Sequence, residues 1–400
     1  MRPSIAGVLL ASVALADGAA FAQETTTEVL VLGVEHSAML VAETYQPAVF
    51  RAFIERTDPD AICIERAPEE FARGSHYEFT YEIQHIAVPY AREHGIPLCP
   101  FDWLPATDDQ ILAFGIDIER PPPLRPRQGF GAFITFGDSA VLNRDLFHAE
   151  SDAEQERYRA WYMNMAEQPR ADFARRLFLY RTFLQAMRVA RAAREFAGGR
   201  VLVIVGAMHK DDIEQILRGQ PGVRVTSPAD VGAPTPEQVD AHVRLDDLAA
   251  IATFNLLGAQ AATGNVDWDW MRRIVERLEL ERPGAETRLL RTRLGVLTGA
   301  LDPAAAARRY REIRGDPAAR TRFTWDGVID RGRLDSFHDP FGNLTIAERA
   351  TLEEARELLR AGRTAEAHAL RTELEAALPP AKAMQLVAYW REWVEPATAS

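Results

Sequence analysis

Two histidines follow apolar runs at the same spacing. Val-Leu-Val-Leu leads into Gly33 and then His36, and Val-Leu-Val-Ile-Val leads into Gly206 and then His209. Glycine at the end of a strand permits a sharp turn and lets a ligand approach the backbone closely. The histidine three residues later can point into the crevice above the strand ends, where α/β sheets bind ligands. We therefore predict that His36 and His209 meet in one site.

Two carboxyl groups stand at equivalent places in the chain. Glu65 follows the apolar run at residues 62–64, and Asp102 follows the run at residues 98–101. A charged group directly after a buried strand is unfavourable unless it is solvated, paired or coordinating. Titratable groups at the ends of four predicted strands therefore indicate a shared site.

Such a set supports two kinds of chemistry. Two neutral imidazoles and a carboxylate can bind a divalent metal ion and leave a position open for water. The same groups can act as acid and base without a metal. The histidine spacing, 209 − 36 = 173 residues, differs from local metal motifs such as His-Glu-x-x-His. A divalent metal of unspecified identity, held by His36, Glu65 and His209, is thus one of two alternatives.

These segments together resemble the TraB/Tiki superfamily, a group related to erythromycin esterases and ChaN-type haem-binding proteins. The matching stretches are residues 31–36, 59–66 and 203–209, and Leu179-Tyr180-Arg181-Thr182 is similar to the family's helical arginine segment. The resemblance covers roughly residues 28–230, leaves the segment 104–165 unmatched, and does not extend to the helical carboxyl-terminal part.

The resemblance implies a role for each matching residue. His36 and His209 would be metal ligands or acid and base, and Glu65 a ligand or general base. Arg181 would anchor a substrate carboxylate or a developing oxyanion. We add Asp102 to the candidate site because it follows a predicted strand, and not because of the resemblance. The first turn reads Gly-Val-Glu-His where a small hydroxyl residue is more usual, and residue 182 is threonine where an acid or amide is frequent. These departures bear on the particular activity and leave the fold unaffected.

The elements that must position these groups alternate between strand and helix, which is typical of an α/β fold with a largely parallel or mixed central sheet covered by helices. The predicted strands are residues 29–32, 61–64, 96–101, 201–205 and 223–226. The predicted helices are residues 41–56, 79–94, 169–196 and 211–217. Residues 104–165 form an insertion, with Pro121-Pro122-Pro123 and Gly129-Phe130-Gly131 in its irregular part. Such a segment is either a lid or a surface decoration.

The pattern becomes helical throughout after the stretch at 227–236. Apolar positions at helical spacing predict helices at residues 245–257, 268–280, 287–297, 304–313, 346–359 and 364–378. Residues 355–378 resemble one antiparallel hairpin of the tetratricopeptide kind. We therefore expect an α/β domain at 23–235 and an all-helical domain at 240–400.

The amino terminus predicts export. Arg2, an apolar run at 5–16 and Ala20-Phe21-Ala22 before Gln23 match a cleavable signal peptide at residues 1–22. The run is shorter than the roughly 20 apolar residues of a membrane span. We expect cleavage before Gln23, no membrane span afterwards, and a periplasmic or secreted location.

Charge and cysteine content argue against a protein that binds nucleic acid or anionic membranes and against a disulfide scaffold. The net charge is −12, and an acidic surface repels nucleic acid and anionic lipid. Cys63 and Cys99 are too few for a disulfide scaffold and are interpreted as core residues. In an oxidising compartment they could pair if their strands are neighbours, although positions side by side in a sheet rarely offer good disulfide geometry.

The sequence therefore favours an exported hydrolase that cleaves a peptide or ester bond in a peptide or small-molecule substrate. One alternative is a protein that binds haem or another small ligand. A further alternative is a catalytically inactive scaffold. In the binding protein the helical domain would recruit a protein partner, and in the scaffold the helical domain would itself do the work.

Overall fold

The computed structural model describes residues 25–114, 122–125, 135–164 and 169–395. The predicted signal peptide and the segment Gly129-Phe130-Gly131 lie outside these residues. Within the described ranges, no helix is both long and apolar enough to cross a membrane.

A five-stranded parallel sheet forms the centre of the amino-terminal half. Its strands are β1 (Thr27–Val34), β2 (Ala61–Ile64), β3 (Leu98–Pro100), β4 (Arg200–Gly206) and β5 (Val223–Thr226). Their order is β3-β2-β4-β1-β5, and every pair is parallel. The buried runs of β1 and β4 lie at the centre, as expected for strands covered on both faces. The predicted fold class, an α/β sheet followed by a helical region, is confirmed.

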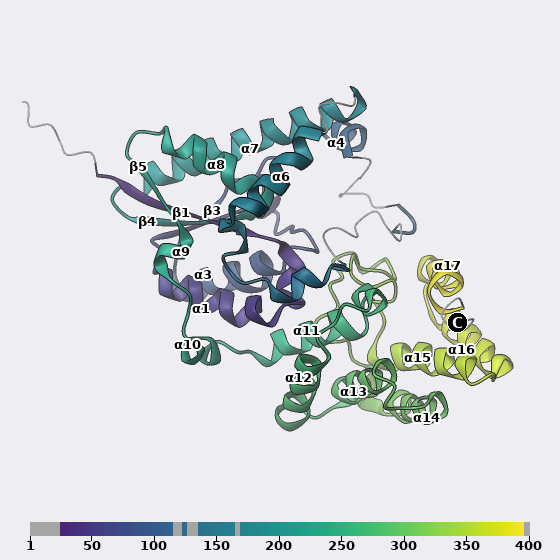
Figure 1. The fold of residues 1–400 in the computed structure, drawn as a ribbon. Helices are drawn as coiled ribbons and strands as arrows, with labels where there is room; N and C mark the ends of the chain where they lie inside the picture. The colour runs from purple at the N-terminus through teal and green to yellow at the C-terminus, as the bar shows by residue number, and fades with distance from the viewer. Residues whose placement is uncertain (1–24, 115–121, 126–134, 165–168, 396–400) are drawn as a thin grey trace, which may run out of the picture.

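Helices cover both faces of this sheet (Figure 1). The long helix α7 (Pro169–Glu195) and α8 (Ala207–Arg218) lie on one face, while α1 (Pro47–Thr57) and α3 (Val88–His94) lie on the other. Alternate residues of each strand point to opposite faces. Val29 and Val31 accordingly belong to the apolar cluster under α7 and α8, and Leu30 belongs to the cluster under α1 and α3.

Several predicted helix limits differ from the structure. The helix expected from residue 41 begins only at Pro47, because Gln46 is extended and a residue before proline is disfavoured in the α conformation. The chain before it forms short 3₁₀ turns at His36–Leu40 and Glu43–Tyr45. The helix expected at 211–217 already starts at Ala207. His209 therefore lies in the first helical turn.

The helix predicted at 79–94 has two parts. Glu82–Ala87 is a π-helix, and α3 follows directly. Pro89 lacks the backbone N–H that would bond to an earlier carbonyl, and single wide turns of this kind often mark functional positions. The next predicted strand, 96–101, shortens to Leu98–Pro100 at the sheet edge.

The described part of the insertion is largely helical. It contains α4 (Thr107–Phe114), short 3₁₀ turns at Ser139–Asn143 and His148–Glu150, and α6 (Asp152–Asn164). In Figure 1, α4 and α6 lie beside α7.

The carboxyl-terminal region is helical, as predicted. Its helices are α9 (Pro228–Val231), α10 (Pro236–Ala241), α11 (Leu245–Leu256), α12 (Trp268–Glu281), α13 (Ala285–Leu297), α14 (Pro303–Arg314), α15 (Ile346–Arg360), α16 (Thr364–Ala377) and α17 (Pro380–Tyr389). A 3₁₀ turn, Pro317–Arg320, follows α14, and a π-helical turn, Trp390–Val394, follows α17. Helices α15 and α16 pack together around Gly362, which has a φ of 74°. One apolar cluster continues from α1 and α3 into α11, α12 and α13.

Candidate functional site

The two Gly-x-x-His segments lie side by side because β1 and β4 are neighbours. These strands pair in parallel, with Val34 opposite Gly206. Both histidines therefore follow the carboxyl ends of their strands on the same side of the sheet. His36 lies in a 3₁₀ turn and His209 in the first turn of α8. This is where the carboxyl ends of parallel strands form ligand sites.

Three predicted site residues surround Gly206. A Cβ atom on Gly206 would lie 3.3 Å from Oε2 of Glu65, 3.5 Å from Nε2 of His36 and 3.8 Å from Cδ2 of His209. Because glycine has no side chain, the three groups can all approach one position beside the Gly206 backbone. The structure thus brings His36, His209 and Glu65 together as the sequence predicted.

His36 is oriented by a carboxyl group. Its Nδ1 lies 2.9 Å from Oε1 of Glu82, a fully buried residue of the π-helix. A carboxylate accepts hydrogen bonds, so Nδ1 carries a hydrogen and Nε2 faces the space beside Gly206. Burial lowers the pKa of His36, but the charge and hydrogen bond of Glu82 outweigh this effect and raise it above its usual value. Phe79 packs edge-on against the ring, with 5.3 Å between the ring centres.

His209 is held in the corresponding tautomer by a hydroxyl group. Its Nδ1 lies 2.7 Å from Oγ1 of Thr182, and that hydroxyl donates to the carbonyl of Phe178 at 2.9 Å. Because the hydroxyl hydrogen is used, Nδ1 of His209 is the donor of this pair and Nε2 is an acceptor. Burial, assisted by the charge of Arg181, holds the pKa of His209 well below its usual value. The ring also stacks on Phe178, with 4.5 Å between centres.

Glu65 links the two histidines to the rest of the site. Its Oε2 accepts a hydrogen bond from the backbone N–H of Gly206 at 2.6 Å. Its Oε1 accepts from Nη2 of Arg181 at 2.8 Å and lies 3.7 Å from Nε2 of His209. Burial raises the pKa of Glu65 above its usual value, although Arg181 opposes this shift.

Asp102 is fully buried and forms an ion pair with the partly exposed Arg181 beside Glu65. Arg181 donates from Nε to Oδ1 of Asp102 at 2.8 Å and from Nη2 to Oδ2 at 2.7 Å. Gln185 and Tyr77 also contact this carboxylate, at 2.8 and 3.3 Å. Burial would raise the pKa of Asp102, but the charge and hydrogen bonds of Arg181 lower it. In this arrangement Asp102 orients Arg181, whose side chain is 24% exposed.

Several site residues were not found from the sequence. Glu82 was missed because nothing in a local pattern connects it with His36, 46 residues earlier. Phe178, Thr182 and Gln185 share the helical face of α7 that points at the sheet. The sequence singled out Thr182 only as a departure from the family pattern, and for Phe178 and Gln185 the helical spacing was the only available signal.

The helical region also reaches the site. Glu78 accepts hydrogen bonds from the backbone N–H groups of Ile329 and Phe337, at 3.0 and 2.9 Å. The ring of Phe337 contacts Phe79, with 5.9 Å between centres. Since Phe79 packs on His36, residues of the helical region support one wall of the site.

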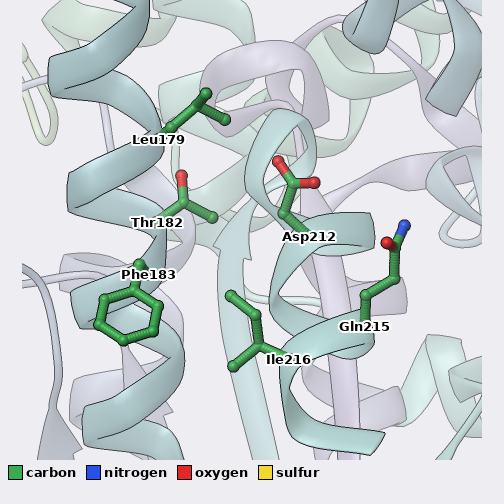
Figure 2. A pocket seen from close by; sticks show the side chains of 6 residues that line it. All are labelled: Leu179, Thr182, Phe183, Asp212, Gln215 and Ile216. Carbon is green, nitrogen blue, oxygen red and sulfur yellow. The ribbon is translucent and has the colours of Figure 1, made fainter. Parts of the chain in front are cut away.

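A pocket lies between α7 and α8 and includes Thr182 in its lining. Figure 2 shows the side chains that line it, and its volume is about 190 Å³. The lining residues are Leu179, Thr182, Phe183, Asp212, Gln215 and Ile216. Thr182 therefore belongs both to this pocket and to the contact with His209.

The donor set at Gly206 has the chemistry of a zinc site but not its geometry. Imidazole and carboxylate ligands suit Zn²⁺, and a carboxylate on the second nitrogen, like Glu82 on His36, is typical of metal-bound histidine. Among the described residues, however, no group of three or more His, Cys, Asp or Glu side chains is arranged to hold a metal ion. Both oxygens of Glu65 are already bonded to Arg181 and Gly206.

Comparison with protein-family models, curated proteins and solved structures finds no match to this chain. The resemblance to the TraB/Tiki superfamily stays a prediction, and functional arguments must come from the site itself.

Proposed function

We propose that this chain is an exported hydrolase that uses acid–base chemistry to cleave a peptide or ester bond. One observation carries the proposal: Nε2 of His36, Nε2 of His209 and the carboxylate of Glu65 converge beside Gly206. All three are hydrogen-bond acceptors when the histidines are neutral. A water molecule bound among them would be oriented and prepared to lose a proton.

His36 is the proposed general base. Its Nε2 takes a proton from the attacking water, and Glu82 stabilises the imidazolium that forms, as a carboxylate does for histidine in hydrolytic triads. The same imidazolium then donates its proton to the leaving group. Glu82 raises the pKa of His36, which makes its Nε2 a stronger base toward the attacking water.

His209 and Glu65 are the proposed water-positioning groups. Since its pKa is held low, His209 stays neutral and its Nε2 continues to accept a hydrogen bond. Arg181 supplies positive charge next to Glu65 and is partly exposed. It would therefore bind a substrate carboxylate or the oxyanion that develops during attack.

The experiment is a hydrolysis assay with variants of both histidines. The purified chain is assayed on p-nitrophenyl esters and chromogenic peptides, with His36→Gln, His209→Gln and the control His242→Gln. His242 pairs with Glu55 at the surface and takes no part in the site. We expect kcat/KM to fall about 100-fold or more in both site variants, with little change in the thermal midpoint.

The control variant should match wild type. Equal activity in all four proteins, or no turnover of any substrate by wild type, would contradict the proposal.

The metal-assisted form of this hydrolysis is the second candidate. The donor set and the contact of Glu82 with His36 favour it, but the side chains would have to move, because no group of the described residues is arranged to hold an ion. His36, Glu65 and His209 would hold the ion, which would lower the pKa of bound water. Elemental analysis separates the two forms. One divalent ion per chain, lost in the His36→Gln/His209→Gln double variant, supports the metal form, whereas activity in metal-free protein supports the acid–base form.

A further inference from the structure

The two cysteines occupy directly paired positions on neighbouring strands. Cys63 of β2 lies opposite Cys99 of β3, and both belong to the apolar layer beneath α7. Both side chains therefore lie on the same face of the sheet. The sequence favoured two core residues but left pairing possible if their strands are neighbours, and the structure shows that β2 and β3 are neighbours.

The two thiols differ in exposure. Cys63 is fully buried, whereas Cys99 is partly exposed on the edge strand. This asymmetry resembles an attacking thiol with a resolving thiol behind it.

The general spacing of paired strands is compatible with a disulfide at the Cα atoms, but the Cβ atoms must come closer. Neighbouring strands lie about 4.8 Å apart, and disulfides join residues whose Cα atoms are about 4.4–6.8 Å apart. The Cβ atoms must approach to about 3.8 Å, so one strand must move slightly. Strand β3 has three residues and a partner on one side only, so it can move.

We propose that Cys63 and Cys99 are a redox-active dithiol that closes to a cross-strand disulfide when it meets a small-molecule or protein disulfide. The Cys99 thiolate attacks one sulfur of the external disulfide, whose S–S bond breaks and releases one thiolate. Cys63 then gives up its proton and attacks Sγ of Cys99, which releases the second thiolate. The two cysteines are oxidised, the external disulfide is reduced to two thiols, and both cysteine protons end on those thiols.

Formation of the disulfide would also restrain the candidate site, because two site residues follow the cysteines at the strand ends. Glu65 follows Cys63 by two residues and Asp102 follows Cys99 by three, and Arg181 binds both carboxylates. Beyond the strands, Phe101 and Asp102 donate backbone hydrogen bonds to Ile64 and Arg66, at 3.1 and 3.0 Å. A covalent link at 63 and 99 therefore restrains the segment that carries this ion pair.

The test uses the purified full-length chain and oxidised glutathione, and it needs no substrate. After incubation the protein is acid-quenched, denatured, alkylated with iodoacetamide and mapped by mass spectrometry without reduction. We expect a peptide pair joined through residues 63 and 99, with neither cysteine alkylated, and full alkylation after dithiothreitol. Amide hydrogen exchange at Phe101 and Asp102 should be slower in the oxidised chain.

Two variants make the result decisive. In Cys63→Ala, Cys99 should form a mixed disulfide with glutathione. Cys99→Ala should stay unmodified, because Cys63 is buried. Neither variant should show a redox-dependent change in amide exchange. Alkylation of both cysteines in oxidised wild type, a glutathione adduct on Cys99 with Cys63 still a thiol, or a disulfide between two chains would overturn the proposal. These outcomes do not depend on whether the chain is a hydrolase.

Discussion

His36 carries the most unusual backbone among the site residues. Its φ is 42°, one of two positive values among the described non-glycine residues. Such a conformation is uncommon outside glycine and is often found where function requires it. The hydrogen bond from Nδ1 to Glu82 and the packing of Phe79 fix the ring in this position. The orientation of the proposed base thus depends on Glu82 as much as on its own chain segment.

Glu82→Gln should shift the pH dependence of activity. Glu82 raises the pKa of His36, and the base must be neutral to accept a proton, so activity rises as pH passes upward through that pKa. Removing the charge lowers the pKa, and the acidic limb of the kcat/KM profile should move to lower pH. The maximum rate should fall about 100-fold or less, because a base of lower pKa is weaker.

The measurement is a full pH–rate profile of both proteins. An unshifted acidic limb in Glu82→Gln would show that His36 is not the group that titrates in the rate.

Some site residues could be predicted from the sequence, and the residues that orient the histidines could not. His36, Glu65, Asp102 and His209 could be predicted because each follows an apolar run that ends a strand. Glu82 and Thr182 could not, because their role depends on contacts between distant segments. A side chain that orients a histidine leaves no local pattern in the sequence.

At the scale of elements, the site depends on the strand order. Strand β4 lies between β1 and β2. Both Gly-x-x-His segments and Glu65 therefore follow the carboxyl ends of three adjacent strands. Buried parallel strands are recognisable as continuous apolar runs, so the sequence predicted the five strands. It could not predict their order, because pairing between segments far apart in the chain is a property of the whole packed sheet.

The two strand-end glycines should respond differently to alanine. Gly206 has an ordinary φ of −52° and ψ of 129°, but a Cβ there would enter the centre of the site. Gly206→Ala should therefore keep its thermal midpoint and lose activity, about 100-fold, as expected when reacting groups are displaced.

Gly33→Ala is the matched control. Its Cβ would lie 2.7 Å from Cβ of Ala149 and 3.2 Å from Cδ of Lys210. Overpacking of this kind lowers the free energy of unfolding by about 1–3 kcal/mol. Thermal unfolding and kinetics of both variants measure the difference. Full activity in Gly206→Ala would place the reacting atoms elsewhere.

At the scale of the whole molecule, the helical region and the sheet share one core. The apolar cluster beneath α1 and α3 continues into α11, α12 and α13, and Glu78 binds the segment that contains Phe337. The individual helices could be predicted from their spacing, but not which face each would cover. The link between the helical region and His36 through Phe79 is visible only in the assembled fold.

His338 at this junction should make stability depend on pH. It is buried against Phe254 and Trp325, and burial lowers its pKa from 6.5 to about 4. Arg125 and His85 oppose its charge, while the backbone carbonyl of Glu78 favours it. Between these two pKa values the unfolded chain binds a proton that the native chain does not, so stability falls as pH decreases from 6.5 towards 4.

Each pKa unit corresponds to about 1.4 kcal/mol. In His338→Gln the thermal midpoint should therefore decrease less steeply over this range than in wild type. Calorimetry at several pH values measures both slopes, and identical slopes would show that His338 is protonated in the native state.

The most direct test of the account is the protonation state of the two site imidazoles. Long-range proton–nitrogen NMR of the histidine-labelled chain reports which ring nitrogen carries the hydrogen, with Glu65→Gln as the comparison. Above the pKa of His36, we predict that both rings carry their hydrogen on Nδ1, and that Glu65→Gln changes the Nε2 signals of His36 and His209 together. A hydrogen on Nε2 of either ring would contradict a shared site. Nε2 signals that are the same in wild type and Glu65→Gln would also contradict it.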